Sequence, residues 1–119
     1  MIKLITSALQ PSLCSASEQQ SKPLRLGLFQ MRWDSDPKAH VARLQEGVAT
    51  CAHAGAELVF LPELTLSRYP ADKRPQDDKD RQPERLEDGP TVAFAQAAAR
   101  ANDVFVQVSL YEQADRDDG

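Results

Sequence analysis

Two short apolar runs on either side of one amphipathic stretch most constrain how this chain can fold. Residues Leu24–Gln30 alternate apolar and other residues and then become nearly continuously apolar, which is typical of a strand. The run Glu57–Leu61 is apolar after its first residue and is closed by Pro62, which is typical of a strand buried on both faces, as in a parallel sheet. With a helix between them, these segments form one βαβ unit, whose crossover is right-handed in nearly all proteins.

The segment between the two runs carries both end signals of a helix. Asp36 is an acid at the N-cap position and Pro37 stands at the first helical position. Gly55 stands where a glycine commonly follows the end of a helix. The apolar side chains between these signals recur at helical spacing: Val41, Leu44, Val48, Cys51 and Ala52. The sequence therefore predicts a helix of about 17 residues with one buried face.

A long charged segment separates this unit from the rest of the chain. Half of residues 65–90 are charged and four are prolines, so we expect no regular core element there. A loop of this length inside a domain is either functional or disordered. Gly89 and Pro90 then open an alanine-rich helix, expected at about Val92–Ala101, and a third strand is expected over Val104–Leu110.

The two ends of the chain differ from the part between them. Residues 1–23 are rich in serine and glutamine, and their apolar part is too short for a signal peptide, so we expect a disordered extension. Asp118-Gly119 predicts a hairpin turn whose return strand does not follow. The 119 residues therefore suit one incomplete domain, residues 24–119, in the order β-α-β-loop-α-β, with an unpaired edge on its third strand.

Composition argues against several classes of function. The chain has 14 Lys and Arg against 18 Asp and Glu, a net charge of −4, and no basic stripe, so a nucleic acid is not an expected partner. No apolar run approaches the roughly 20 residues that span a bilayer, so no membrane partner is expected. Two cysteines, Cys14 and Cys51, are too few for a disulfide scaffold and indicate a cytoplasmic location. Together with His40 and His53 they show no zinc-ligand spacing, and both histidines are interpreted as surface or satisfied side chains.

Glu63 is the one ionisable residue placed directly behind a fully apolar strand. Ligands of open parallel sheets collect beyond the carboxyl ends of the strands, which is where Glu63 lies. We expect its carboxylate to be partly removed from water there, as a general base requires. The alternative is a solvated glutamate in a loop or first helical turn. Trp33, after the first strand, either lines a pocket or caps the sheet.

The segment that contains Glu63 resembles the first catalytic motif of the nitrilase, or carbon–nitrogen hydrolase, superfamily. In that motif a buried strand ends in Pro-Glu-Leu, with Tyr-Pro a few residues later, as in Pro62-Glu63-Leu64 and Tyr69-Pro70. Other segments agree in register with the family pattern over about residues 24–119: Phe29-Gln30, Asp36-Pro37, Gly55-Ala56, Asp88-Gly89-Pro90 and Ser109–Glu112.

This resemblance implies a four-layer α-β-β-α sandwich, of which residues 24–119 form the N-terminal part. It also implies hydrolysis of a non-peptide C–N bond in a small-molecule amide, N-carbamoyl compound or nitrile, with an amide or N-carbamoyl substrate favoured. The family uses a Cys nucleophile, a Glu base and a Lys that stabilises the intermediate, with no metal or organic cofactor, and its members commonly form homo-oligomers.

Only one member of that catalytic set has a counterpart in this sequence. Glu63 matches the glutamate by position. Lys73 and Lys79 lie in the charged loop, before the place of the catalytic lysine, Cys51 is expected to be a small core residue, and Cys14 lies in the extension. We therefore expect no turnover from these 119 residues alone.

The resemblance also suggests residues around a substrate pocket, and it leaves two other interpretations open. Arg68, Tyr69 and Glu112 are the pocket candidates, against solvated positions for each. A non-catalytic α/β fragment that pairs through its open sheet edge is the second interpretation. The third, a flavodoxin-like nucleotide-binding domain, lacks the glycine-rich turn that should follow the first strand, because residues 30–34 contain no glycine.

Overall fold

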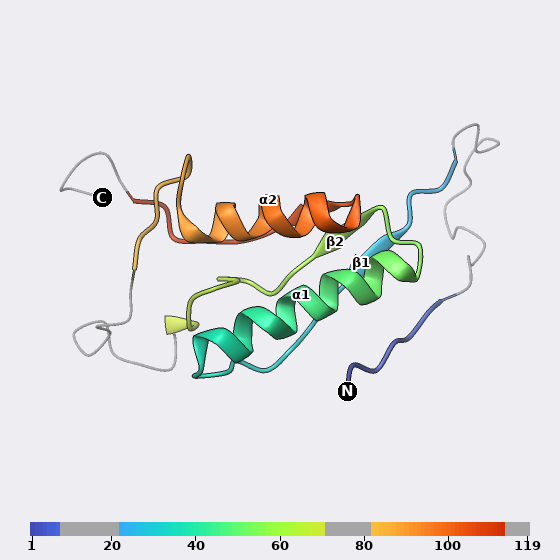
Figure 1. The fold of residues 1–119 in the computed structure, drawn as a ribbon, viewed down its shortest axis with the longest axis horizontal. Coiled ribbons are helices and arrows are strands. Elements are labelled where there is room, and N and C mark those ends of the chain that lie inside the picture. The colour runs from blue at the N-terminus through green and yellow to red at the C-terminus, as the bar shows by residue number, and fades with distance from the viewer. Residues whose placement is uncertain (8–21, 71–81, 114–119) are drawn as a thin grey trace, which may run out of the picture.

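The computed structural model describes residues 1–7, 22–70 and 82–113, and it shows a parallel sheet with two helices (Figure 1). The strands are ordered β1-β2-β3 and both pairs are parallel. The elements are β1 (Leu26–Leu28), α1 (Pro37–His53), β2 (Leu58–Phe60), α2 (Pro90–Asn102) and β3 (Phe105–Gln107). The predicted α/β class and the order of elements are confirmed, and each strand is shorter than its apolar run.

Helix α1 begins and ends at its sequence signals. The Asp36 carboxylate accepts a hydrogen bond from the Lys38 amide at 3.0 Å, as an N-cap does. At the other end Gly55 has φ +89°, a conformation that favours glycine, and its amide donates to Ala52 O at 2.9 Å. The Ala56 amide reaches back to Cys51 O at 3.0 Å, which completes a Schellman motif. The predicted 17-residue helix is therefore confirmed.

The core lies between the helices and one face of the sheet. Gly27, Val59 and Val106 are aligned across the three strands. A side chain at Gly27 is excluded by packing, because a Cβ there would lie 2.7 Å from the Cβ of Cys51. The buried apolar cluster consists of Leu44, Val48, Cys51, Ala56, Val59, Leu61, Phe94 and Ala98. Close packing of α1 on β1 therefore depends on a glycine in the strand.

The opposite face of the sheet is apolar, and the residues that the structure describes leave it uncovered. Leu28 and Phe105 are each 77% exposed and Leu26 is 51% exposed, while Leu58 and Phe60 beside them are half-buried. The expectation that β2 is buried on both faces is therefore wrong for the described residues. The reason is the position of the helices, since α1 and α2 both pack on the face that carries Val59.

The N-terminus of helix α2 is capped by a side chain from the segment that precedes the helix. Its N-cap residue, Gly89, has no side chain, and the cap comes instead from Glu84, a buried carboxylate. Glu84 Oε2 accepts from the Thr91 amide and Oε1 accepts from Thr91 Oγ1, both at 2.7 Å. A Cβ at Gly89 would lie 2.9 Å from the Cβ of Glu84, so glycine permits this approach. A negative charge at the N-terminus of a helix is also favoured by the helix dipole.

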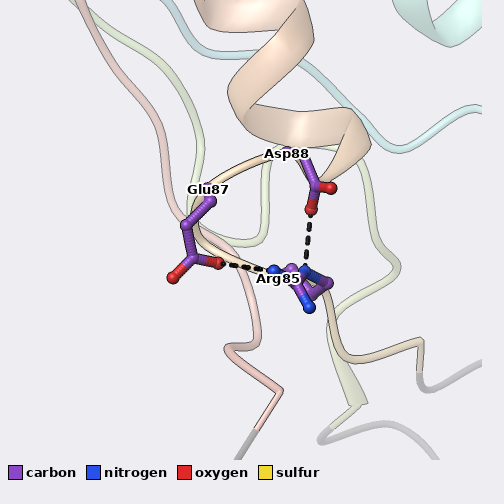
Figure 2. Close-up of polar contacts among 3 residues, drawn as sticks. All are labelled: Arg85, Glu87 and Asp88. Carbon is purple, nitrogen blue, oxygen red and sulfur yellow. Dashed lines mark hydrogen bonds and ion pairs between the residues drawn. The ribbon is translucent and has the colours of Figure 1, made fainter.

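The segment that leads into α2 also holds an exposed ion-pair group. Figure 2 shows Arg85 between two carboxylates, with Nε 3.0 Å from Asp88 Oδ1 and Nη2 3.7 Å from Glu87 Oε2. These side chains are about two-thirds exposed or more, so each pair contributes little to stability. Residues 65–70 and 82–89 contain no α-helix and no strand of the sheet, as predicted. No described helix has the length and apolar character that a membrane crossing requires.

Candidate active site

The loop that carries Glu63 lies at the carboxyl edge of the sheet and is held by one buried side chain. Thr65 is 2% exposed. Its Oγ1 donates to Pro62 O at 3.0 Å and accepts from the Ser109 amide at 3.1 Å, and its own amide donates to Ser109 O at 2.9 Å. Because Ser109 follows β3, these bonds fix the loop after β2 to the chain that leaves the neighbouring strand.

Leu64, directly after Glu63, has a strained backbone. Its φ is +50°, in the left-handed region that non-glycine residues rarely adopt, and its side chain is buried. Such a conformation is unfavourable by about 1–2 kcal/mol for an L-residue and persists only where the surroundings enforce it. The Ser67 amide, which donates to Leu64 O at 2.9 Å, closes the turn around it. Strain of this kind is concentrated at functional sites.

The Glu63 side chain itself is exposed. The partial removal from water that we expected from the sequence is therefore not supplied by the described residues. Within residues 1–7, 22–70 and 82–113, no hydrogen bond or ion pair to this carboxylate is found. The exposed carboxylate thus lies at the carboxyl edge of the sheet, next to the backbone that Leu64 and Thr65 hold in place.

A buried histidine of α1 contacts the same loop. His40 is 5% exposed, and its Nε2 lies 2.8 Å from Thr65 O. The Asp34 amide donates to His40 Nδ1 over a longer 3.4 Å. The indole of Trp33 lies against the imidazole, with ring centroids 4.3 Å apart. The prediction that His40 is a satisfied histidine is confirmed, although the sequence gave no indication of its partners.

A pocket of about 290 Å³ opens beside this loop. Three segments line it: the chain after β1, the Glu63 loop and the chain before α2. The lining residues are Trp33, Ser35, Leu66, Ser67, Arg68 and Gln82. The interpretation of Trp33 as a pocket residue is therefore confirmed, and a small molecule could enter here from the carboxyl edge of the sheet.

The three pocket candidates from the sequence lie in different places. Arg68 lines the pocket, and Tyr69 is 53% exposed and outside the lining. Glu112 is exposed and pairs with Glu84 through an isolated parallel bridge, in which the Glu84 amide donates to Tyr111 O at 2.7 Å. Sequence reasoning did not select Ser35 or Gln82, and no local signal in the sequence marks them.

Cys51 lies in the last turn of α1, beside Gly27 of β1. It is 8% exposed and touches Gly27 from the helix side. Burial raises the pKa of its thiol above the ordinary value of 9.0, because the thiolate would lose its hydration. The prediction that Cys51 is a small core residue is confirmed. Cys14, Lys73 and Lys79 lie outside the described residues.

We expect alkylation of Cys51 in the folded protein to be at least about tenfold slower at pH 8 than in denaturant, since only the thiolate reacts. Because the pKa is raised, the folded-state rate should still be increasing with pH above 9.0, where the rate of an ordinary thiol levels off. Iodoacetamide labelling, followed by peptide mass spectrometry to separate Cys51 from Cys14, measures both rates. Equal rates in the folded and denatured protein would contradict this placement.

No metal site is formed by the residues that the structure describes: three His, Cys, Asp or Glu side chains never come together there in a suitable group. Among the described residues, the carboxyl edge thus carries the Glu63 carboxylate, the hydrogen-bonded loop that holds it and the pocket beside this loop.

Comparison with known proteins bears on what this edge does. No curated protein sequence matches the chain. The sequence model of the family described as carbon-nitrogen hydrolase matches residues 25–119, which is well over half of the chain and includes both helices, all three strands and the Glu63 loop. The chain therefore belongs to the carbon–nitrogen hydrolase family.

Proposed function

We propose that this chain supplies the general base of a hydrolase that cleaves the amide, N-carbamoyl or nitrile group of a small molecule, and that Glu63 is this base. The observation that carries the proposal is the backbone around Glu63. A strained, buried Leu64 and a doubly bonded Thr65 hold an exposed carboxylate at the carboxyl edge of a parallel sheet. A glutamate that is only solvated in a loop would not require the strained Leu64 and the doubly hydrogen-bonded Thr65 beside it.

The pocket beside the loop supports a small-molecule substrate. Its volume of about 290 Å³ suits a compound of a few heavy atoms, and Trp33 and Leu66 give it apolar walls. Arg68 and Ser67 add polar groups to the lining. Arg68 is therefore proposed as a pocket residue, whereas Tyr69 and Glu112 are proposed to border the site from outside this lining.

In the proposed reaction Glu63 moves protons. Its carboxylate accepts the proton of a cysteine thiol as the sulfur forms a bond to the substrate carbon. It gives that proton to the substrate nitrogen. With an amide the protonated nitrogen departs and a thioester remains, whereas with a nitrile the nitrogen stays bound in a thioimidate and departs as ammonia only after water has added. Glu63 then deprotonates the water that hydrolyses this intermediate, and a lysine ammonium stabilises the negative charge that develops on the tetrahedral species.

The cysteine and the lysine of this reaction are proposed to come from outside residues 24–119. Cys51 is buried in the core with a raised thiol pKa, so it does not suit a nucleophile. Residues 24–119 are accordingly proposed to be an incomplete domain that does not turn over by itself. A cytoplasmic, homo-oligomeric enzyme that needs no cofactor is proposed for the complete protein.

The test compares residues 1–119 with the product of the complete open reading frame. Ammonia release is measured with three compounds: an aliphatic amide, an N-carbamoyl amino acid and an aliphatic nitrile. We expect release from at least one compound by the complete product and none by residues 1–119. Release by residues 1–119 alone would show that a different nucleophile operates, and no release by either protein would contradict the proposed activity.

The uncovered sheet face favours a second candidate, a non-catalytic interaction module. Leu26, Leu28 and Phe105 form an exposed apolar surface of the kind that commonly marks a contact with another protein layer. This candidate becomes the better description if the open reading frame ends at Gly119 and its product releases no ammonia.

A further inference from the structure

His40 joins two segments of the carboxyl edge that are far apart in the sequence. One ring nitrogen contacts Thr65 O in the Glu63 loop, 25 positions away, and the other contacts the Asp34 amide in the loop before α1. The imidazole is 5% exposed and belongs to the first turns of α1, whose start is fixed by the Asp36 cap. A buried ring with both nitrogens engaged has a fixed position and orientation.

The partners of His40 determine which nitrogen carries the proton. The Asp34 amide is a donor, so Nδ1 has to be the acceptor in that contact. Thr65 O is an acceptor, so Nε2 has to be the donor in the other. Both contacts are satisfied only by the neutral ring with its hydrogen on Nε2. A hydrogen on Nδ1 would point at the Asp34 amide hydrogen.

Residues next to these two contacts line the pocket from two segments of the chain. Trp33, whose ring is tilted by 48° to the His40 ring with the centroids 4.3 Å apart, lines the pocket from the loop before α1. Leu66 and Ser67 line it from the Glu63 loop, directly after the Thr65 carbonyl that His40 holds. His40 is thus placed between the pocket wall on one side and the base-carrying loop on the other.

We infer that His40, as its neutral Nε2–H tautomer, is a positioning residue that fixes the Glu63 loop relative to the Trp33 wall of the pocket. The expected effect on catalysis rests on the proposed function of Glu63. The fixing of the loop by His40 does not depend on that function. His40 touches no reacting atom. It acts through the Thr65 carbonyl, two residues from the proposed base.

The test combines a spectroscopic signature with a rescue. In the complete protein, a long-range proton–nitrogen correlation spectrum of the imidazole rings reports which nitrogen carries the hydrogen. We expect His40 to show Nε2–H and a bare Nδ1 at neutral pH. His40→Gln keeps an N–H at about the reach of Nε2, whereas His40→Leu removes it. Amide hydrogen exchange at Thr65 should accelerate at least about tenfold in His40→Leu and stay within about threefold of the original protein in His40→Gln.

His53→Leu is the matched control, because His53 is an exposed histidine of the same helix whose Nδ1 contacts only Ala49 O of its own helix. It should leave exchange at Thr65 unchanged. An Nδ1–H tautomer of His40, or equal exchange at Thr65 in His40→Leu and His53→Leu, would overturn the inference. If His40→Leu does not fold, the tautomer in the original protein and exchange in His40→Gln still decide the question.

Kinetics separate this inference from the proposed function. Displacement of a catalytic group by about 1 Å lowers rates by up to about 100-fold, so His40→Leu should lower kcat by roughly 10- to 100-fold, with kcat restored in His40→Gln. If His40 is the Nε2–H tautomer in the original protein and His40→Leu shows the expected exchange effect while Glu63→Gln retains full activity, the positioning of the loop stands and the role of Glu63 fails. If Glu63→Gln is inactive while His40→Leu retains full kcat and normal exchange, the role of Glu63 stands and the positioning role fails.

Discussion

Glu63→Gln in the complete protein is expected to lower kcat by about 10²- to 10⁴-fold, the usual contribution of a positioned general base. Glutamine has the size of glutamate but accepts no proton at neutral pH. Within the described part of the chain the Glu63 carboxylate makes no hydrogen bond or ion pair, so its replacement removes no contact of the fold. The free energy of unfolding should therefore change by less than about 0.5 kcal/mol.

The control for this variant lies at the opposite end of β2. Glu57 precedes β2 at its amino end, is exposed, and accepts a 3.4 Å hydrogen bond from the Arg25 amide through one oxygen that glutamine retains. Glu57→Gln should keep both stability and kcat. Steady-state kinetics and denaturant unfolding of the two variants decide the matter. A Glu63→Gln enzyme with the kcat of the original protein would end the assignment of Glu63 as the base.

Glu84→Ala is expected to lower the free energy of unfolding by about 2–4 kcal/mol. The substitution leaves the Thr91 amide and hydroxyl without their acceptor at the start of α2, and an unsatisfied buried donor destabilises by about 1–3 kcal/mol. Thr91 is 1% exposed, so water cannot easily replace the carboxylate. The effect should decrease when Thr91→Val is already present, because one of the two donors is then absent, and urea unfolding of the four proteins measures this coupling.

The neighbouring Glu87 gives the comparison for Glu84. It is an exposed carboxylate of the same segment, 3.7 Å from Arg85 Nη2 (Figure 2). Glu87→Ala should change stability by no more than about 0.5 kcal/mol. Equal losses in the two variants would mean that Glu84 contributes through charge alone and not through its buried hydrogen bonds.

Local signals predicted the helices well. The Asp36 cap and Gly55 define α1 because each acts on its own turn of the backbone, and the helix runs over Pro37–His53 as expected. The strands were overestimated because pairing ends where the neighbouring strand ends, which an apolar run such as Leu24–Gln30 does not reveal. The exposure of Phe105 could not be predicted from the sequence either, since it depends on which face of the sheet the helices cover.

The sequence indicated the Glu63 position but not its support. Pro-Glu-Leu after an apolar run selected Glu63 only together with the other segments that agree in register with the family pattern. The contacts of Thr65 with Ser109 and His40 join segments far apart in the chain. From the sequence alone, Glu84 is one of the many charged residues in the loop over residues 65–90. A signal was present: Gly89 and Pro90 open α2 without a capping side chain, which implies that another residue satisfies the first amides.

The all-parallel sheet has a consequence for how the chain assembles. Neither of the two strand pairs that the structure describes is a hairpin, so each pairing must close a long stretch of chain. The Arg25–Glu57 contact beside β1 and β2 spans 32 positions, and the Thr65–Ser109 contact beyond β2 and β3 spans 44. Loop-closure entropy separates these two lengths by only about 0.3 kcal/mol, so it does not set their order. The two helices differ in how locally they are capped. Residues next to α1 cap both of its ends, whereas the N-terminus of α2 is capped by the Glu84 side chain. We therefore expect β1, α1 and β2 to associate first, and the Glu63 loop to acquire its strained turn only in the last step, when β3 arrives with Ser109.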